Sequence, residues 1–194
     1  MRRNSCLVMV ITLVLLLGMN VATVLAADSG YPVLITSGGQ GPDGLIVKVL
    51  LEKEVQDKGI EIPYVQSALP EDIKGVNTLL VAVGVSSKGL GAAGINLSDE
   101  MSRVESLLQA ANEQGSYVVL IHSGGSGRRG ASTDGMMTSI ISYADEVVVL
   151  QAGNEDGFFT KLGTTAGKPV TVVNTRNELG VVIRDILEGK QEGD

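Results

Sequence analysis

Short apolar runs recur along the chain at the length of β-strands. They cover residues 32–36, 60–65, 78–85, 117–122, 146–150 and 169–173. Most of these runs are continuously apolar and do not alternate with polar residues, which is typical of strands buried on both faces of a parallel sheet. The pattern therefore predicts a mostly parallel sheet of five to six strands.

The segments between these runs carry the period of amphipathic helices. One apolar stripe extends from Met101 to Ala111, and the last segment begins with Thr175 and Glu178 at capping-box spacing. Strands that alternate with helices predict right-handed crossovers and a three-layer α/β/α sandwich, flavodoxin-like or Rossmann-like. Because residues 28–194 contain no low-complexity linker or repeat, we expect them to form a single α/β domain.

Pro63 bears on the order of the strands. It interrupts the second apolar run and cannot donate a ladder hydrogen bond, which favours an edge position for that strand. An edge second strand fits the flavodoxin-like order 2-1-3-4-5, extended by a sixth strand, better than the dinucleotide-binding order 3-2-1-4-5-6. The topological switch point then lies between the first and third strands. We therefore expect a ligand crevice between the loops at residues 37–44 and 86–94.

The first 27 residues differ from the rest of the chain. Arg2 and Arg3 precede an uncharged apolar run at residues 7–17, and small residues come directly before Asp28. This is the pattern of a cleaved secretory signal peptide, with an uncleaved membrane anchor as the alternative. We predict a signal peptide over residues 1–27, a periplasmic or extracellular location, and contact with a membrane only through the export signal.

Composition and charge argue against several kinds of partner and chemistry. Without Arg2 and Arg3, 13 of the 15 basic residues remain against 22 acidic ones, so the net charge is −9. Such a chain repels nucleic acid and anionic membrane surfaces. With no tryptophan, four tyrosines and two phenylalanines, stacking platforms for sugars or bases are not expected. Cys6 is the only cysteine and lies in the leader, so no disulfide or thiolate chemistry is expected.

Three segments match the glycine pattern G-x-G-x-x-G, at residues 39–44, 89–94 and 125–130. Each follows a predicted strand, where backbone amides and helix N-termini can bind an anion. No cofactor is predicted, because the acidic residue that would bind a dinucleotide ribose is missing after the second strand. Tight turns are the alternative for the first two loops. The third carries Arg128 and Arg129, which indicate a lid or an anion-binding pair, with a solvated loop as the alternative.

His122 is the only histidine, which argues against histidine-rich metal sites and His-pair catalysis in a monomer. A hydrolase or transferase using His122 with Ser123 or Asp134 is one alternative, although a G-x-S-x-G nucleophile elbow is absent. Residues 154–157 carry too few carboxylates for a calcium loop, and Asp156 is expected to begin a helix. No metal is predicted.

Three strings resemble a known family. They are PVLITSGGQGPD at residues 32–43, GASTDGM at 130–136 and GNEDGFFT at 153–160. They resemble the bacterial exported domain family of unknown function numbered 6305, over essentially the whole chain after the leader. The resemblance implies export and a bacterial source and assigns no activity. Because all three strings are predicted to follow strands, it also implies that they belong to one site.

The combined hypothesis is an exported domain that binds a small molecule, with an anion among the candidate classes. A role as a sensor or as an accessory subunit of an uptake system would fit, and a transport or envelope partner stays open. An enzyme and a structural or interaction domain are the alternatives. The candidate ligand-binding residues are Ser37, Gly39, Gln40, Asp43, Ser86, His122, Ser123 and Arg128. Among them Gln40, Asp43, Ser123 and Arg128 should face one crevice, while Arg129 should point elsewhere.

Overall fold

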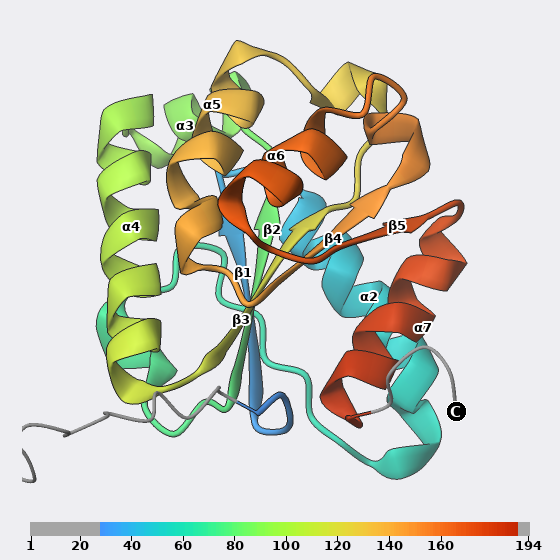
Figure 1. Ribbon diagram of the computed structural model, residues 1–194. Helices are drawn as coiled ribbons and strands as arrows, with labels where there is room; N and C mark the ends of the chain where they lie inside the picture. The colour runs from blue at the N-terminus through green and yellow to red at the C-terminus, as the bar shows by residue number, and fades with distance from the viewer. Residues whose placement is uncertain (1–27, 190–194) are drawn as a thin grey trace, which may run out of the picture.

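A single parallel sheet organises residues 28–189, the part of the chain that the computed structural model describes. Its five strands follow one another in the order β1-β2-β3-β4-β5, and every neighbouring pair is parallel. The strands are β1 (Val33–Gly38), β2 (Thr78–Val83), β3 (Tyr117–His122), β4 (Glu146–Leu150) and β5 (Val170–Val173) (Figure 1). β1 and β2 are buried along their whole length, as expected of parallel strands covered on both faces. The predicted parallel sheet is therefore confirmed.

The segment around Pro63 lies along the outer edge of β1. The Ile35 amide donates to the Pro63 carbonyl oxygen at 3.0 Å, and the Val65 amide donates to the Ile35 carbonyl oxygen at 3.0 Å. β2 pairs with the other side of β1, so the second apolar run takes the predicted edge position. The predicted strand itself is reduced to one isolated bridge, between Ile35 and Tyr64. Pro63 explains the reduction, because it has no N–H group with which to extend the ladder.

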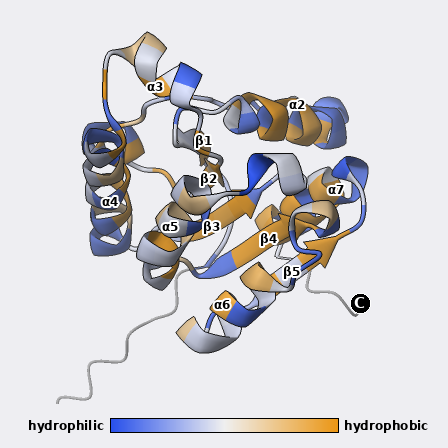
Figure 2. Ribbon diagram, turned by 90° about the horizontal axis from the view of Figure 1, so that it is seen from above, coloured by the Kyte–Doolittle hydropathy of each residue, from blue (hydrophilic) through white to orange (hydrophobic). Residues whose placement is uncertain are grey.

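Helices cover the two faces of the sheet. Those of the described residues are α2 (Asp43–Val55), α3 (Ser87–Ala93), α4 (Leu97–Gln114), α5 (Ala131–Ile140), α6 (Phe158–Ala166) and α7 (Arg176–Leu187). The buried side chains of α2 and α7 share one apolar core, and those of α4, α5 and α6 share a second core on the opposite face. Figure 2 shows the apolar strands between these two helical layers. This arrangement confirms the α/β/α sandwich.

Local sequence signals fix the ends of helices α4 and α7. Asn96 caps α4 by accepting a hydrogen bond from the Asp99 amide at 3.0 Å, and Gly115 ends the helix with a left-handed φ of 81°. Thr175 caps α7 by accepting from the Glu178 amide at 3.2 Å. The capping signal predicted for the last helix is thus present.

The signal peptide predicted over residues 1–27 lies outside the described residues. Between residues 28 and 189, no helix has the length and apolar character needed to cross a membrane.

Candidate functional site

The loops after β1 and β2 pack directly against each other at the carboxyl edge of the sheet. A Cβ atom on Gly39 would lie 2.6 Å from the Val85 Cα atom, and one on Gly89 would clash with the Gln40 carbonyl oxygen. Glycine is therefore required because the two backbones touch, not because amides must stay accessible. At these two contacts the loops leave no space for a ligand, so they do not support the crevice expected between residues 37–44 and 86–94.

A buried ion pair from α4 fixes the first of these loops. Glu100 has no exposed surface, and its Oε1 atom accepts from Arg103 Nη2 at 2.7 Å. The Gly39 amide donates to Oε1 at 2.8 Å, and Gln40 Nε2 donates to Oε2 at 3.0 Å. Burial is the largest influence and raises the pKa of Glu100, but the hydrogen bonds from Arg103 and Gln40 together hold it below its usual value. The loop is thus committed to a structural contact.

The candidate serines of the first two loops, Ser37 and Ser86, form hydrogen bonds within the protein. Ser37 Oγ donates to the Gly41 carbonyl oxygen at 3.2 Å and lies 3.1 Å from the Tyr64 hydroxyl oxygen. Ser86 caps α3 by accepting from the Gly89 amide at 3.1 Å. The two candidate serines of these loops therefore have structural partners.

Candidate residues from two loops, after β1 and after β3, come together at the carboxylate of Asp43. Asp43 is the first residue of α2 and is buried. Its Oδ1 atom accepts from Ser123 Oγ at 3.0 Å, and its Oδ2 atom accepts from Arg128 Nη2 at 2.5 Å. Gln40 does not join them, because its side chain turns toward Glu100. Asp43 already neutralises Arg128, whose side chain is one-third exposed, so the expected anion-binding group has a counter-ion of its own.

His122 is a buried core residue. Its Nδ1 atom donates to the Val83 carbonyl oxygen at 3.0 Å, and its ring lies 4.9 Å from that of Phe159. Burial lowers the pKa of His122, so the ring is neutral at pH 7. Nε2 is buried without a hydrogen-bond partner, and Ser123 bonds to Asp43 and not to His122. The described residues therefore contain no Ser–His pair of the kind that a hydrolase needs.

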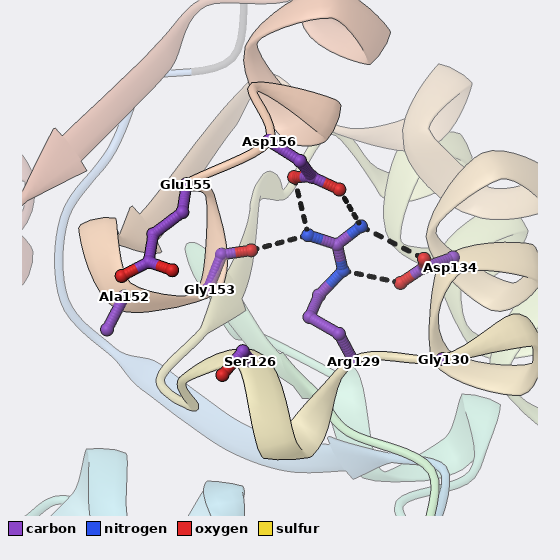
Figure 3. A pocket seen from close by; sticks show the side chains of 8 residues that line it. All are labelled: Ser126, Arg129, Gly130, Asp134, Ala152, Gly153, Glu155 and Asp156. Carbon is purple, nitrogen blue, oxygen red and sulfur yellow. Dashed lines mark hydrogen bonds and ion pairs between the residues drawn. The ribbon is translucent and has the colours of Figure 1, made fainter.

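Arg129 joins the loops that follow β3 and β4 (Figure 3). Its Nε and Nη2 atoms donate to the two oxygens of Asp134 at 2.6 and 2.9 Å. Nη1 donates to the Gly153 carbonyl oxygen at 2.5 Å, and Nη1 and Nη2 reach the two oxygens of Asp156 at 3.0 and 3.2 Å. These bonds occupy all five guanidinium N–H groups. Arg129 points away from Arg128, as expected, but it is not an inert neighbour, because it joins two loops.

Aromatic rings support the same guanidinium. Its central carbon lies 4.5 Å from the ring centre of Phe158 and 4.8 Å from that of Phe159, both at the start of α6. Hydrogen bonds from Arg129 lower the pKa of Asp134 and of Asp156. Asp156 also accepts from the Phe158 amide at 3.1 Å, in keeping with its expected place at the start of a helix. We call Arg129, Asp134, Asp156 and the Gly153 carbonyl the arginine clamp.

A pocket of about 420 Å³ opens beside the arginine clamp (Figure 3). Its lining residues come from the loops after β3 and β4 and from the start of α5: Ser126, Arg129, Gly130, Asp134, Ala152, Gly153, Glu155 and Asp156. The volume is typical of small-molecule sites, and the carboxyl edge is where open α/β sheets bind ligands. None of the eight candidate ligand-binding residues lines this pocket. Residues 28–189 contain no group of three acidic, histidine or cysteine side chains that could hold a metal ion.

The strings noted in the sequence relate to this pocket in different ways. The strings at residues 130–136 and 153–160 both contribute lining residues, whereas the string at 32–43 contributes none. That first string reaches the loop after β3 through Asp43, which accepts hydrogen bonds from Ser123 and Arg128. Two strings after neighbouring strands are the sequence signal that could have located the pocket, but the partners of Arg129 were not apparent from spacing alone.

Comparison with known protein families gives a match over most of the chain. Residues 30–187 match a family model described as Domain of unknown function (DUF6305). None of the curated proteins compared matches the chain.

Proposed function

We propose a function from the geometry of the pocket, because the chain belongs to the DUF6305 family, whose description assigns no activity. The family match confirms the resemblance seen in the sequence. We propose that the protein is exported and binds a small polar molecule in the pocket between the loops after β3 and β4. A role as a sensor or as an accessory subunit in uptake would follow from such binding.

The observation that carries the proposal is a pocket whose walls are already held in place. Loops after strands are ordinarily the mobile parts of an α/β domain. Here the arginine clamp connects the loop after β3 to the first turn of α5 and to the loop between β4 and α6. A site that is ordered before binding loses less conformational entropy when the ligand arrives. The clamp therefore supports a binding role for this end of the sheet.

Export is supported by the leader alone. A basic start, a short apolar run and small residues before Asp28 are the features that the export machinery reads. Mass spectrometry of the protein recovered from cells tests this part of the proposal. We expect a chain that begins at Ala27 or Asp28, and a chain with intact Met1 in the membrane fraction would overturn it.

A thermal-shift screen of the purified protein against small polar molecules tests binding. A ligand at a hundredfold excess over its Kd stabilises the folded state by about 2.7 kcal/mol. Ala152 is exposed and lines the pocket, so Ala152→Trp should fill the space and remove the shift. Ala93→Trp, at an exposed alanine of α3, is the matched control and should keep it. A shift that survives Ala152→Trp would place binding elsewhere.

A further inference from the structure

The walls of the pocket carry an excess of negative charge. Its lining residues include three carboxylates, from Asp134, Glu155 and Asp156, against the single guanidinium of Arg129. The formal charge of the lining is therefore −2. An anion entering this space would be repelled, whereas a cation would be attracted.

The one cation of the pocket has no hydrogen bond left to give. Asp134, Asp156 and the Gly153 carbonyl use all five N–H groups of Arg129. A carboxylate or phosphate could bind this guanidinium only by displacing one of its present partners. Arg129 is thus a part of the wall and not a group that recognises an anion.

The hydrogen-bonding capacity that is left over is mainly that of acceptors. Glu155 is exposed and its carboxylate has no hydrogen-bond or ion-pair partner among residues 28–189; no dashed line reaches it in Figure 3. The Ser126 hydroxyl, also exposed and without a partner in that range, can accept a hydrogen bond as well. A ligand that complements these groups must bring hydrogen-bond donors, and the negative charge of the lining favours N–H donors on a cation over neutral O–H donors.

We propose that the pocket binds a small organic cation that carries N–H donors, such as a primary ammonium group. The inference rests on the proposed function and adds the class of ligand. The Glu155 carboxylate serves as the counter-ion, the Ser126 hydroxyl accepts a second hydrogen bond, and the field of Asp134 and Asp156 adds attraction. The occupied donors of Arg129 discriminate against anions.

Isothermal titration of the purified protein with three probes at equal ionic strength tests the inference. The probes are 1,4-diaminobutane, tetramethylammonium, which has the charge without N–H donors, and acetate. We expect the diamine to bind, tetramethylammonium to bind at least tenfold more weakly, and acetate to give no signal. Glu155→Gln should weaken the diamine at least tenfold, the usual effect of losing a charge-assisted hydrogen bond. Glu61→Gln, at another exposed glutamate, is the matched control and should leave the affinity unchanged.

These variants distinguish an error in the inferred ligand class from an error in the proposed binding function. No binding of the diamine, or an equal loss in Glu155→Gln and Glu61→Gln, overturns the cation inference. Binding of acetate or of a neutral molecule that Ala152→Trp abolishes also overturns it, and leaves small-molecule binding in place. If no compound in the wider screen responds to Ala152→Trp, the proposed function is overturned together with the inference.

Discussion

The loops after β1 and β2 meet through their backbones, whereas the loops after β3 and β4 are joined by an arginine side chain in addition to a backbone contact between Gly153 and Gly124. In the first pair, Gly39 and Gly89 let two segments approach so closely that a Cβ atom would collide with the opposite loop. In the second pair, Arg129 spans the gap and reaches Asp134, Gly153 and Asp156. The first pair is closed, and a pocket of about 420 Å³ lies beside the second.

The difference shows that glycine in a strand-to-helix loop can have two opposite effects. Where the facing segment is near, the missing side chain allows close packing and removes the space for a ligand. Where nothing faces the glycine, the missing side chain leaves part of the wall open. Gly130, where an added Cβ atom would meet nothing within 4 Å, lines the pocket in this second way, whereas a Cβ atom on Gly153 would lie 2.5 Å from the Gly124 carbonyl oxygen.

Replacing Glu100 should give the largest loss of stability, because its buried carboxylate holds the loop after β1 in place. The variant therefore tests the closed pair of loops. Glu100→Gln leaves Arg103 without a counter-ion in a site where the Arg103 side chain is only 10% exposed. Breaking a buried ion pair in this way typically costs about 3–5 kcal/mol. Urea denaturation should show that loss in the free energy of unfolding. Lys48→Met, in the more exposed pair with Glu52, is the control and should cost less than about 1 kcal/mol.

Arg129→Met should have the next largest effect and would test the open pair of loops. The change removes every hydrogen bond of the arginine clamp and leaves the carboxylates of Asp134 and Asp156 side by side. We expect a loss of about 2–3 kcal/mol in the free energy of unfolding, together with loss of ligand binding. Arg128→Met removes one ion pair to Asp43 and should affect binding less. Equal binding losses in the two variants would contradict the distinct role given to Arg129.

Gly89→Ala should destabilise the closed loops by a smaller amount. Its Cβ atom would clash with the Gln40 carbonyl oxygen, and overpacking of this kind costs about 1–3 kcal/mol. Gly91→Ala, in the same helix, meets nothing within 4 Å and should be neutral or stabilising by up to about 1 kcal/mol. Thermal unfolding of the two variants compares them directly. Similar effects at both positions would mean that the loops are not in tight contact.

The smallest predicted effect is a dependence of stability on pH near neutrality. Burial lowers the pKa of His122 in the folded state, so below pH 6.5 the unfolded chain binds a proton that the folded protein does not. Stability should therefore fall as the pH decreases from 6.5 toward the lowered pKa, by at most about 1.4 kcal/mol per pH unit. Because His122 is the only histidine, His122→Phe should flatten this slope between pH 6 and 7. An unchanged slope in the variant would assign it to other groups.

Much of the fold could be predicted because it depends on local patterns. Continuous apolar runs indicate buried parallel strands, and the missing N–H of Pro63 indicates an edge. The site could be predicted only in part. Whether Gly39 opens or closes a loop depends on Val85, which lies opposite it only after folding.

Neighbouring residues with the same chemistry posed a similar difficulty. Arg128 and Arg129 differ in function because the loop sends one toward Asp43 and the other toward Asp134. The spacing of Glu100 and Arg103 was a visible signal of an ion pair. The burial of this ion pair beneath the first loop could not be seen in the sequence, since it depends on how α4 packs against the end of β1.

The isolated bridge between Ile35 and Tyr64, next to Pro63, limits the addition of a further strand at this edge of the sheet. The Pro63 carbonyl and the Val65 amide point inward to Ile35, which leaves Tyr64 as the residue whose backbone groups face outward there. A neighbouring molecule would find too short a ladder on this side to add a strand, a common protection against aggregation. Growth of the sheet by strand addition would therefore have to begin at the opposite edge, along β5, where the four residues Val170–Val173 form a longer ladder.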